Sequence, residues 1–175
     1  MLTLAERTRA DLIVPHLQAC DAAGVIQELC QVLQRAGLLP DLLRFYHTAL
    51  NRELTISSEV ESGAAFPHGP VPGIPKVVFA LGRSDAPVAW SASPLRTVRL
   101  VFLIAVPDRD MGGYQNLVGG LTHVTRTTGL RDRLLAATEP GGIMDVLREV
   151  PIREPAGCAA VAAGDRPRSD RGGAS

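Results

Sequence analysis

The stretch Val98-Arg-Leu-Val-Phe-Leu-Ile-Ala-Val106 decides the fold, because a single Arg interrupts an otherwise apolar run. Such a run, ended by Pro107, is typical of a strand buried on both faces of a sheet. The β-branched and apolar segment Lys76 to Leu81 (KVVFAL) predicts a second strand. Pro87 to Trp90 and Ala64 to Pro67 predict two weaker, shorter ones.

Five segments on either side of these strands have the apolar spacing of three and four residues that predicts amphipathic helices. Asp21 stands where an N-cap residue would, Gly37 stands where a glycine commonly ends a helix, and Pro40 and Asp41 open the next segment. This order predicts an α/β or α+β domain whose helices cover both faces of a central sheet. The segments run approximately over residues 22–37, 41–53, 114–126, 130–137 and 142–150.

Composition excludes several classes of protein. The 175 residues include 18 basic and 18 acidic side chains, whereas a nucleic-acid-binding domain needs a basic excess. No apolar run approaches the roughly 20 residues that span a bilayer. The charged N-terminus (MLTLAERTRADL) lacks the apolar stretch of a secretory signal. We therefore expect a cytoplasmic protein without membrane insertion.

Neither a metal site nor a disulfide framework is expected, because Cys20, Cys30 and Cys158 are odd in number and lack metal-like spacing. No P-loop pattern occurs in the sequence, and no cofactor is expected. Half of the last 20 residues (AGCAAVAAGDRPRSDRGGAS) are Ala or Gly, and none is a large apolar residue. Since so little surface can be buried there, we predict a disordered tail over residues 151–175.

His68 is the candidate reactive residue because of its setting in Gly63-Ala-Ala-Phe-Pro-His-Gly-Pro70. Pro67 restricts the backbone, and Gly69 would let another molecule approach closely. Nucleophilic histidine chemistry needs one ring nitrogen free to attack and the other held by an acceptor, often a backbone carbonyl. The alternative is a turn histidine without a task. The remaining histidines, His16, His47 and His123, are interpreted as structural or surface residues.

The adjacent pair Arg52-Glu53 ends the second predicted helix. A guanidinium at a helix end could hold a phosphoryl group bidentately if it lay near His68. The alternative is a solvated charge pair, and spacing alone does not choose between the two.

Several segments occur in one order: ALNRE, ESGAAFPHG, KVVFALGR, PVAW, VRLVFLIAVP and NLVGGLTHVTR. In this order the chain resembles the enzyme IIA domains of the phosphoenolpyruvate-dependent sugar phosphotransferase system. The resemblance is to the fructose/mannitol class, which includes nitrogen-regulatory members. It covers residues 5–150 and implies a central mixed sheet flanked by helices on both faces.

The resemblance also implies a function. His68 matches the histidine that accepts a phosphoryl group from the histidine-containing phosphocarrier protein and passes it to a cysteine of enzyme IIB. Arg52 matches the arginine that stabilises the phosphoryl group, and Glu53 matches its neighbour, whose role is less defined. Phe66, Pro67 and Pro70 could form an apolar rim that limits hydrolysis.

Two features depart from the family pattern. Tyr114 stands where members often carry a second, helper histidine. Glu59 and Glu61 add carboxylates that would repel a phosphoryl group if they faced the site. These departures leave two alternatives to a transport carrier: a regulatory protein-interaction module that acts on protein targets, with or without phosphorylation of His68, and a degenerate member that never carries phosphate.

Overall fold

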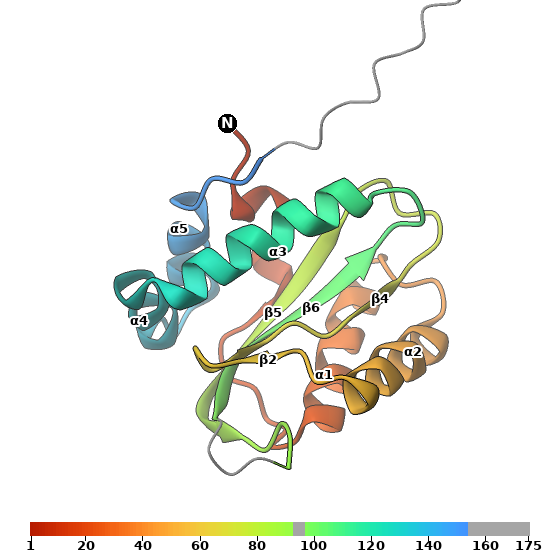
Figure 1. Ribbon diagram of the computed structural model, residues 1–175, viewed down its shortest axis with the longest axis horizontal. Coiled ribbons are helices and arrows are strands. Elements are labelled where there is room, and N and C mark those ends of the chain that lie inside the picture. The colour runs from red at the N-terminus through yellow and green to blue at the C-terminus, as the bar shows by residue number, and fades with distance from the viewer. Residues whose placement is uncertain (93–96, 154–175) are drawn as a thin grey trace, which may run out of the picture.

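The computed structural model describes residues 1–92 and 97–153 (Figure 1). Its centre is a mixed six-stranded sheet with the strand order β1-β5-β6-β3-β2, in which β4 also pairs with β6. The β5–β6 pair is antiparallel, whereas β1 pairs with β5, and β3 and β4 pair with β6, in parallel. The strands are β1 (Ile13–Val14), β2 (Glu59–Val60), β3 (Ala64–Ala65), β4 (His68–Pro70), β5 (Val78–Val88) and β6 (Val98–Val106).

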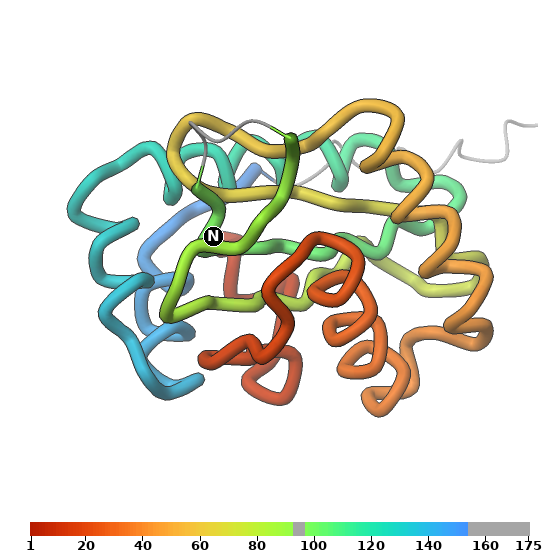
Figure 2. Tube along the Cα trace, turned by 90° about the horizontal axis from the view of Figure 1, so that it is seen from below, coloured from red at the N-terminus to blue at the C-terminus, as the bar shows by residue number. Residues whose placement is uncertain are grey.

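Helices cover both faces of this sheet, as the sequence predicts. Figure 1 shows α1 and α2 on one side of the strands and α3, α4 and α5 on the other. Figure 2, turned by 90°, shows α2 at the opposite end of the trace from α4 and α5. The helices are α1 (Ala22–Arg35), α2 (Leu42–Thr55), α3 (Met111–Arg126), α4 (Thr128–Ala136) and α5 (Pro140–Arg148), preceded by two 3-10 turns, η1 (Leu4–Arg7) and η2 (Ala10–Leu12).

Strand β6 has the predicted bounds and is buried on both faces, because its alternate side chains enter two different cores. Val101 and Leu103 pack with α1 and α2, whereas Phe102 and Ile104 pack with the helices of the other face. The prediction of a separate strand at Pro87 to Trp90 is wrong. A register shift between Arg83 and Val88 lets β5 continue to Val88.

Local caps fix where the helices begin and end. The Asp21 carboxylate accepts the N–H of Gly24 (2.7 Å), as the sequence predicts, and the Asp41 carboxylate accepts the N–H of Arg44 (3.0 Å) at the start of α2. Gly37 has a φ of 75°, the left-handed conformation that follows a helix end. Helix α3 begins three residues earlier than predicted, because Asp110 caps it.

The first residues of the predicted tail, Pro151 and Ile152, pair with the N-terminal segment of the domain. Ile152 is buried and its N–H donates to Leu2 O (2.8 Å), while Pro151 bridges to Thr3. The rest of the predicted disordered tail, residues 154–175, lies outside the described residues. Among the helices that the structure describes, none combines the length and apolarity that a membrane crossing requires.

Candidate functional site

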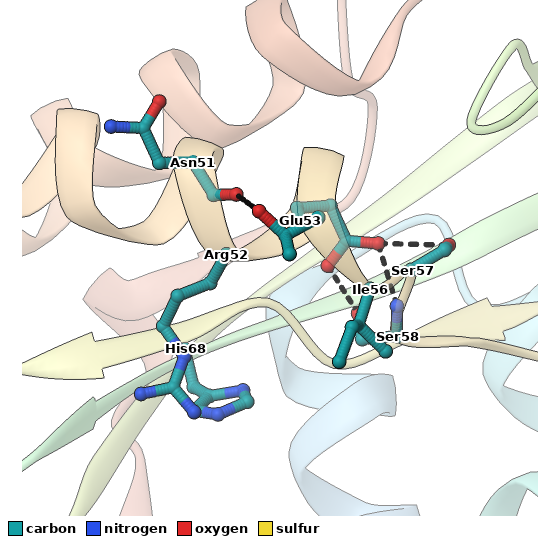
Figure 3. Close-up of a pocket in the computed structure, with 8 residues that line it drawn as sticks. Asn51, Arg52, Glu53, Ile56, Ser57, Ser58 and His68 are labelled. Atoms are coloured by element: carbon teal, nitrogen blue, oxygen red, sulfur yellow. Dashed lines mark hydrogen bonds between the residues drawn. The ribbon is translucent and has the colours of Figure 1, made fainter.

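His68 is the first residue of β4 and lies half-buried at an open pocket of about 420 Å³ between this strand and the end of α2. The sequence predicts a loop here, but residues 68–70 pair in parallel with residues 104–106 of β6. The pocket is lined by Asn51, Arg52, Glu53, Thr55, Ile56, Ser57, Ser58 and His68, of which seven are labelled in Figure 3.

One ring nitrogen of His68 is held by the backbone. Nδ1 lies 3.1 Å from the carbonyl oxygen of Phe66. A carbonyl can only accept, so Nδ1 carries the proton and Nε2 keeps its lone pair. Phe66 is itself anchored, since its ring packs on Phe102 with centroids 5.6 Å apart. The core of the domain thus selects the tautomer that a nucleophilic imidazole needs.

The imidazole is also kept neutral. Burial is the main cause that lowers the pKa of His68 below 6.5, and the Arg52 charge lowers this pKa further. The hydrogen bond to Phe66 and the charge of Glu53 oppose this shift but do not reverse it. At neutral pH, Nε2 is therefore unprotonated and able to attack an electrophile.

Arg52 extends from the last turn of α2 toward the imidazole (Figure 3). The two side chains line the same pocket. Its guanidinium makes no hydrogen bond or ion pair with any residue that the structure describes. The donors of Arg52 are thus available to an anionic group placed beside His68.

Glu53 points the other way and is 6% exposed. Its Oε1 accepts from Ser57 Oγ (3.0 Å), the Ser58 N–H (2.7 Å) and Trp90 Nε1 (2.6 Å), and its Oε2 accepts from Ser58 Oγ (2.6 Å). The Ser58 hydroxyl in turn accepts the Phe66 N–H (3.0 Å). Glu53 therefore ties the end of α2 to the segment that leads to His68, which is a positioning role.

Tyr114, in the first turn of α3, packs against His68 with ring centroids 5.1 Å apart. Burial raises the pKa of its phenol, and the charge of Arg52 opposes that shift. The hydroxyl is therefore a proton donor at neutral pH. All four residues singled out in the sequence lie in or beside one site.

Three expectations about the surroundings are corrected. Phe66 and Pro67 are buried and cannot form an apolar rim, and Pro70 is exposed but lines a different depression. Ile56, which is 79% exposed, is the exposed apolar residue that lines the His68 pocket. Gly69 does not serve a partner, because it is buried and a Cβ there would lie 3.0 Å from Cε2 of Phe45. Its lack of a side chain lets β4 lie against α2.

The carboxylates of Glu59 and Glu61 do not line the His68 pocket. They line a separate depression with Ser62, Thr122 and Arg126. Glu59 also accepts a hydrogen bond from Ser91 Oγ (2.8 Å). The expected repulsion between these carboxylates and an anion at His68 therefore does not follow from their positions.

Sequence reasoning missed the contributions of Ser58, Trp90 and Ile56. No local motif marks them, because each acts through contacts between separate elements. Among the described residues, no group of three or more His, Cys, Asp or Glu side chains could hold a metal ion. Cys20 is exposed and Cys30 is buried, both as free thiols, and Cys158 lies outside the described residues.

A mixed sheet covered by helices on both faces, with a strand-borne histidine beside an arginine, defines a small α/β domain of a recognisable class. Residues 7–150 match the family model described as "Phosphoenolpyruvate-dependent sugar phosphotransferase system, EIIA 2". The chain belongs to this family.

The chain is similar to transport components and to nitrogen regulatory proteins, as three comparisons show. The "PTS system fructose-specific EIIABC component" of Bacillus subtilis is 26% identical over 134 residues, which are 77% of this chain and 21% of that protein. The chain thus spans about a fifth of that longer relative. The "Nitrogen regulatory protein" of Bradyrhizobium diazoefficiens is 24% identical over 147 residues, 83% of this chain and 95% of that one. The crystal structure of the nitrogen regulatory protein IIA-Ntr from Neisseria meningitidis shares the fold, with a TM-score of 0.74 at 22% identity, covering 82% of this chain and 98% of that one.

Proposed function

We propose that this chain is a phosphohistidine carrier in which Nε2 of His68 accepts and then donates a phosphoryl group. The observation that carries this proposal is the hydrogen bond from Nδ1 to Phe66 O, 3.1 Å long, in a pocket that Arg52 also lines. It leaves one ring nitrogen with a free lone pair, in the same pocket as a guanidinium that no described residue pairs with. Family membership supports the general phosphotransfer role.

In the first step, the donor is the phosphohistidine of the histidine-containing phosphocarrier protein. The Nε2 lone pair of His68 forms a bond to phosphorus as the donor N–P bond breaks, and that electron pair returns to the donor imidazole. The Nδ1 proton stays on His68, where Phe66 O stabilises the positive charge that develops on the ring.

Phosphoryl transfer passes through a loose transition state, so positioning and charge stabilisation supply most of the catalysis. Arg52 and the hydroxyl of Tyr114 are the groups beside His68 that donate to the phosphoryl oxygens. Both can donate to an anion, since the hydroxyl remains protonated and the guanidinium is not engaged by another described residue.

In the second step, the thiolate of an enzyme IIB cysteine attacks phosphorus, and the P–Nε2 bond breaks. The electron pair of that bond returns to His68, which regains its neutral form. The name of the Bacillus subtilis relative, an EIIABC component, supports an enzyme IIB partner. Leu54 and Ile56, exposed at 74% and 79% at the end of α2, give such a partner an apolar surface that excludes water.

A second candidate is a regulatory protein in which the phosphorylation state of His68 controls a protein target. The similarity to a nitrogen regulatory protein over 95% of that protein's length favours this function. Both candidates share the first transfer step and differ in the second. Transfer onward to an enzyme IIB cysteine distinguishes them.

The test is incubation of the purified protein with phosphoenolpyruvate, enzyme I and the histidine-containing phosphocarrier protein. We expect one acid-labile phosphate per chain, and none in His68→Ala. His47→Ala, on the exposed surface of α2, is the matched control and should be labelled like wild type. Label that persists in His68→Ala, or a wild-type protein that takes none, contradicts the proposal.

A further inference from the structure

Arg7 is a buried cation that has no counter-ion in the part of the chain that the structure describes. Its side chain belongs to a residue that is 7% exposed, in the 3-10 turn η1. Its Nε is fully buried and has no hydrogen-bond partner. No hydrogen bond or ion pair joins the rest of the guanidinium to any residue within 1–92 and 97–153. The Nε–H left this way is costly, because it loses its hydration and gains no partner.

Arg7 lies at the wall of a second pocket, of about 220 Å³, which shares no lining residue with the pocket of His68. Two more cations line it, Arg9 and Lys76, against the single carboxylate of Glu6. That carboxylate is directed to its own helix start, where Oε2 accepts the Thr3 N–H (2.9 Å). Arg9 is paired with Asp11 (3.0 Å), so Arg7 and Lys76 are the cations that remain for a ligand.

The same pocket holds both cations close to one backbone segment. The Lys76 ammonium donates to the carbonyl of Glu6 (3.1 Å), the residue before Arg7, and keeps further donors available. Thr8 fixes the segment on its other side, since its hydroxyl donates to Phe79 O (2.8 Å). These two hydrogen bonds hold the backbone around Arg7 in place and bring the Lys76 ammonium to it.

Four other residues that line this pocket are apolar. Leu12 and Val78 are buried, and Leu38 and Ile74 are partly buried, so they offer hydrocarbon surface within the pocket. An anion alone would satisfy Arg7 but would leave this apolar surface exposed to water. A ligand that combines an anionic head with a compact apolar body would satisfy both.

We propose that this pocket binds a small molecule with a carboxylate or phosphate group on an apolar body, its anionic group paired with Arg7 and Lys76. The anionic group of the ligand neutralises the positive charge of Arg7 in the N-terminal segment. Its binding is independent of phosphoryl transfer at His68. Carboxylate and phosphate heads share the chemistry that a guanidinium recognises, and the two are distinguished by experiment.

The test uses the full chain with benzoate, phenyl phosphate and inorganic phosphate as probes at constant ionic strength. NMR titration should move the backbone amides of Thr8, Lys76 and Val78 with either aromatic probe. Arg7→Met should weaken that binding at least about tenfold, the effect of losing one charge-assisted hydrogen bond. The better of benzoate and phenyl phosphate identifies the head group.

The controls separate this pocket from other anion sites. Arg35→Met removes an exposed cation from α1 that does not line the pocket, and Arg52→Met removes the cation beside His68. In both variants the probe-dependent shifts of the Thr8, Lys76 and Val78 amides should match those of wild type. Without a probe, Arg7→Met should melt at the wild-type temperature or above it, because a buried unpaired charge has been replaced by an apolar group. Should Arg7→Met fail to fold, Lys76→Gln serves as the second variant, with a smaller loss of affinity.

Two results would overturn the proposal. One is a probe affinity in Arg7→Met equal to that of wild type. The other is a response confined to amides around His68. Equal affinity for inorganic phosphate and phenyl phosphate would contradict the role given to the apolar lining.

Discussion

The imidazole of His68 and the phenol ring of Tyr114 pack with their centroids 5.1 Å apart and their planes tilted by 39°. They come from two separate elements, β4 and the first turn of α3. Asp110 caps that helix by accepting the Gly113 N–H (2.8 Å), which places Tyr114 one turn into α3. The contact gives His68 an aromatic neighbour that carries a hydroxyl.

Tyr114→Phe should separate the packing role of this ring from its donor role. The ring contact remains, so the melting temperature should stay near that of wild type. The rate of phosphoryl transfer from the carrier protein should fall about tenfold, since about 1.4 kcal/mol of transition-state stabilisation is lost. Rapid-quench measurement of labelled protein gives the rate, and an unchanged rate would show that the hydroxyl does not contact the phosphoryl group.

Arg52→Met should slow transfer by about 100-fold without unfolding the domain, because it removes the cation that faces the developing charge. Exposed helix-end charges contribute little to stability, so the melting temperature should be nearly unchanged. Arg44→Met, an exposed arginine nearer the start of α2, is the matched control. A large loss of melting temperature in Arg52→Met would instead make Arg52 structural.

Acid should destabilise the wild-type protein more than His68→Gln. Burial lowers the pKa of His68 in the folded state below 6.5, so the unfolded chain binds the proton more tightly. Above the unfolded pKa both states are neutral at this group, and the free energy of unfolding falls as pH decreases from 6.5 through the folded pKa. Urea unfolding at pH 7.5 and 5.0 measures the difference, and equal losses in the two proteins would contradict it.

Glu53→Gln should lower the free energy of unfolding by about 2 kcal/mol, because buried donors of Ser58 and Trp90 lose a charged acceptor. Trp90 is the only tryptophan, so a shift in its fluorescence emission reports the change at the indole N–H directly. Glu61→Gln, an exposed carboxylate on the nearby turn, should change stability by less than about 0.5 kcal/mol. Equal effects of the two substitutions would remove Glu53 from its positioning role.

Gly69→Ala should cost about 1 kcal/mol, because its Cβ would lie 3.0 Å from Cε2 and 3.3 Å from Cδ2 of Phe45. The clash is specific to that ring. Adding Phe45→Leu should therefore recover about 1 kcal/mol relative to the sum of the single changes, as a double-mutant cycle measures. Strict additivity would locate the cost elsewhere.

Much of the fold is predictable from local pattern. Strand β6 and helix α1 lie where the sequence predicts them. Burial on both faces requires a continuous apolar run, and an N-cap requires an Asp directly before the helix, so both features can be recognised in consecutive residues. Strand β4 is not predictable this way. Its residues, His68-Gly69-Pro70, have turn-forming chemistry, and only their pairing with β6 makes them a strand.

The site shows the same division. His68, Arg52 and Tyr114 are identified through the order of family motifs, and the structure brings them together. The bonds from Ser58 and Trp90 to Glu53 span up to 37 positions in the sequence. Such contacts depend on how α2, the turn that follows it and the end of β5 pack together. No single segment of the sequence encodes that packing.

The two prolines around His68 have a consequence for how other chains can approach. Pro67 O and the Val71 N–H bond to β6, so by the alternation of a strand residues 68 and 70 direct their backbone groups away from it. Pro70 has no N–H, so His68 is the backbone N–H donor of β4 on the edge that faces away from β6. Another polypeptide could form few backbone hydrogen bonds along this edge of β4, so it would have to recognise the protein through side chains. The edge is therefore also a poor template for fibril growth.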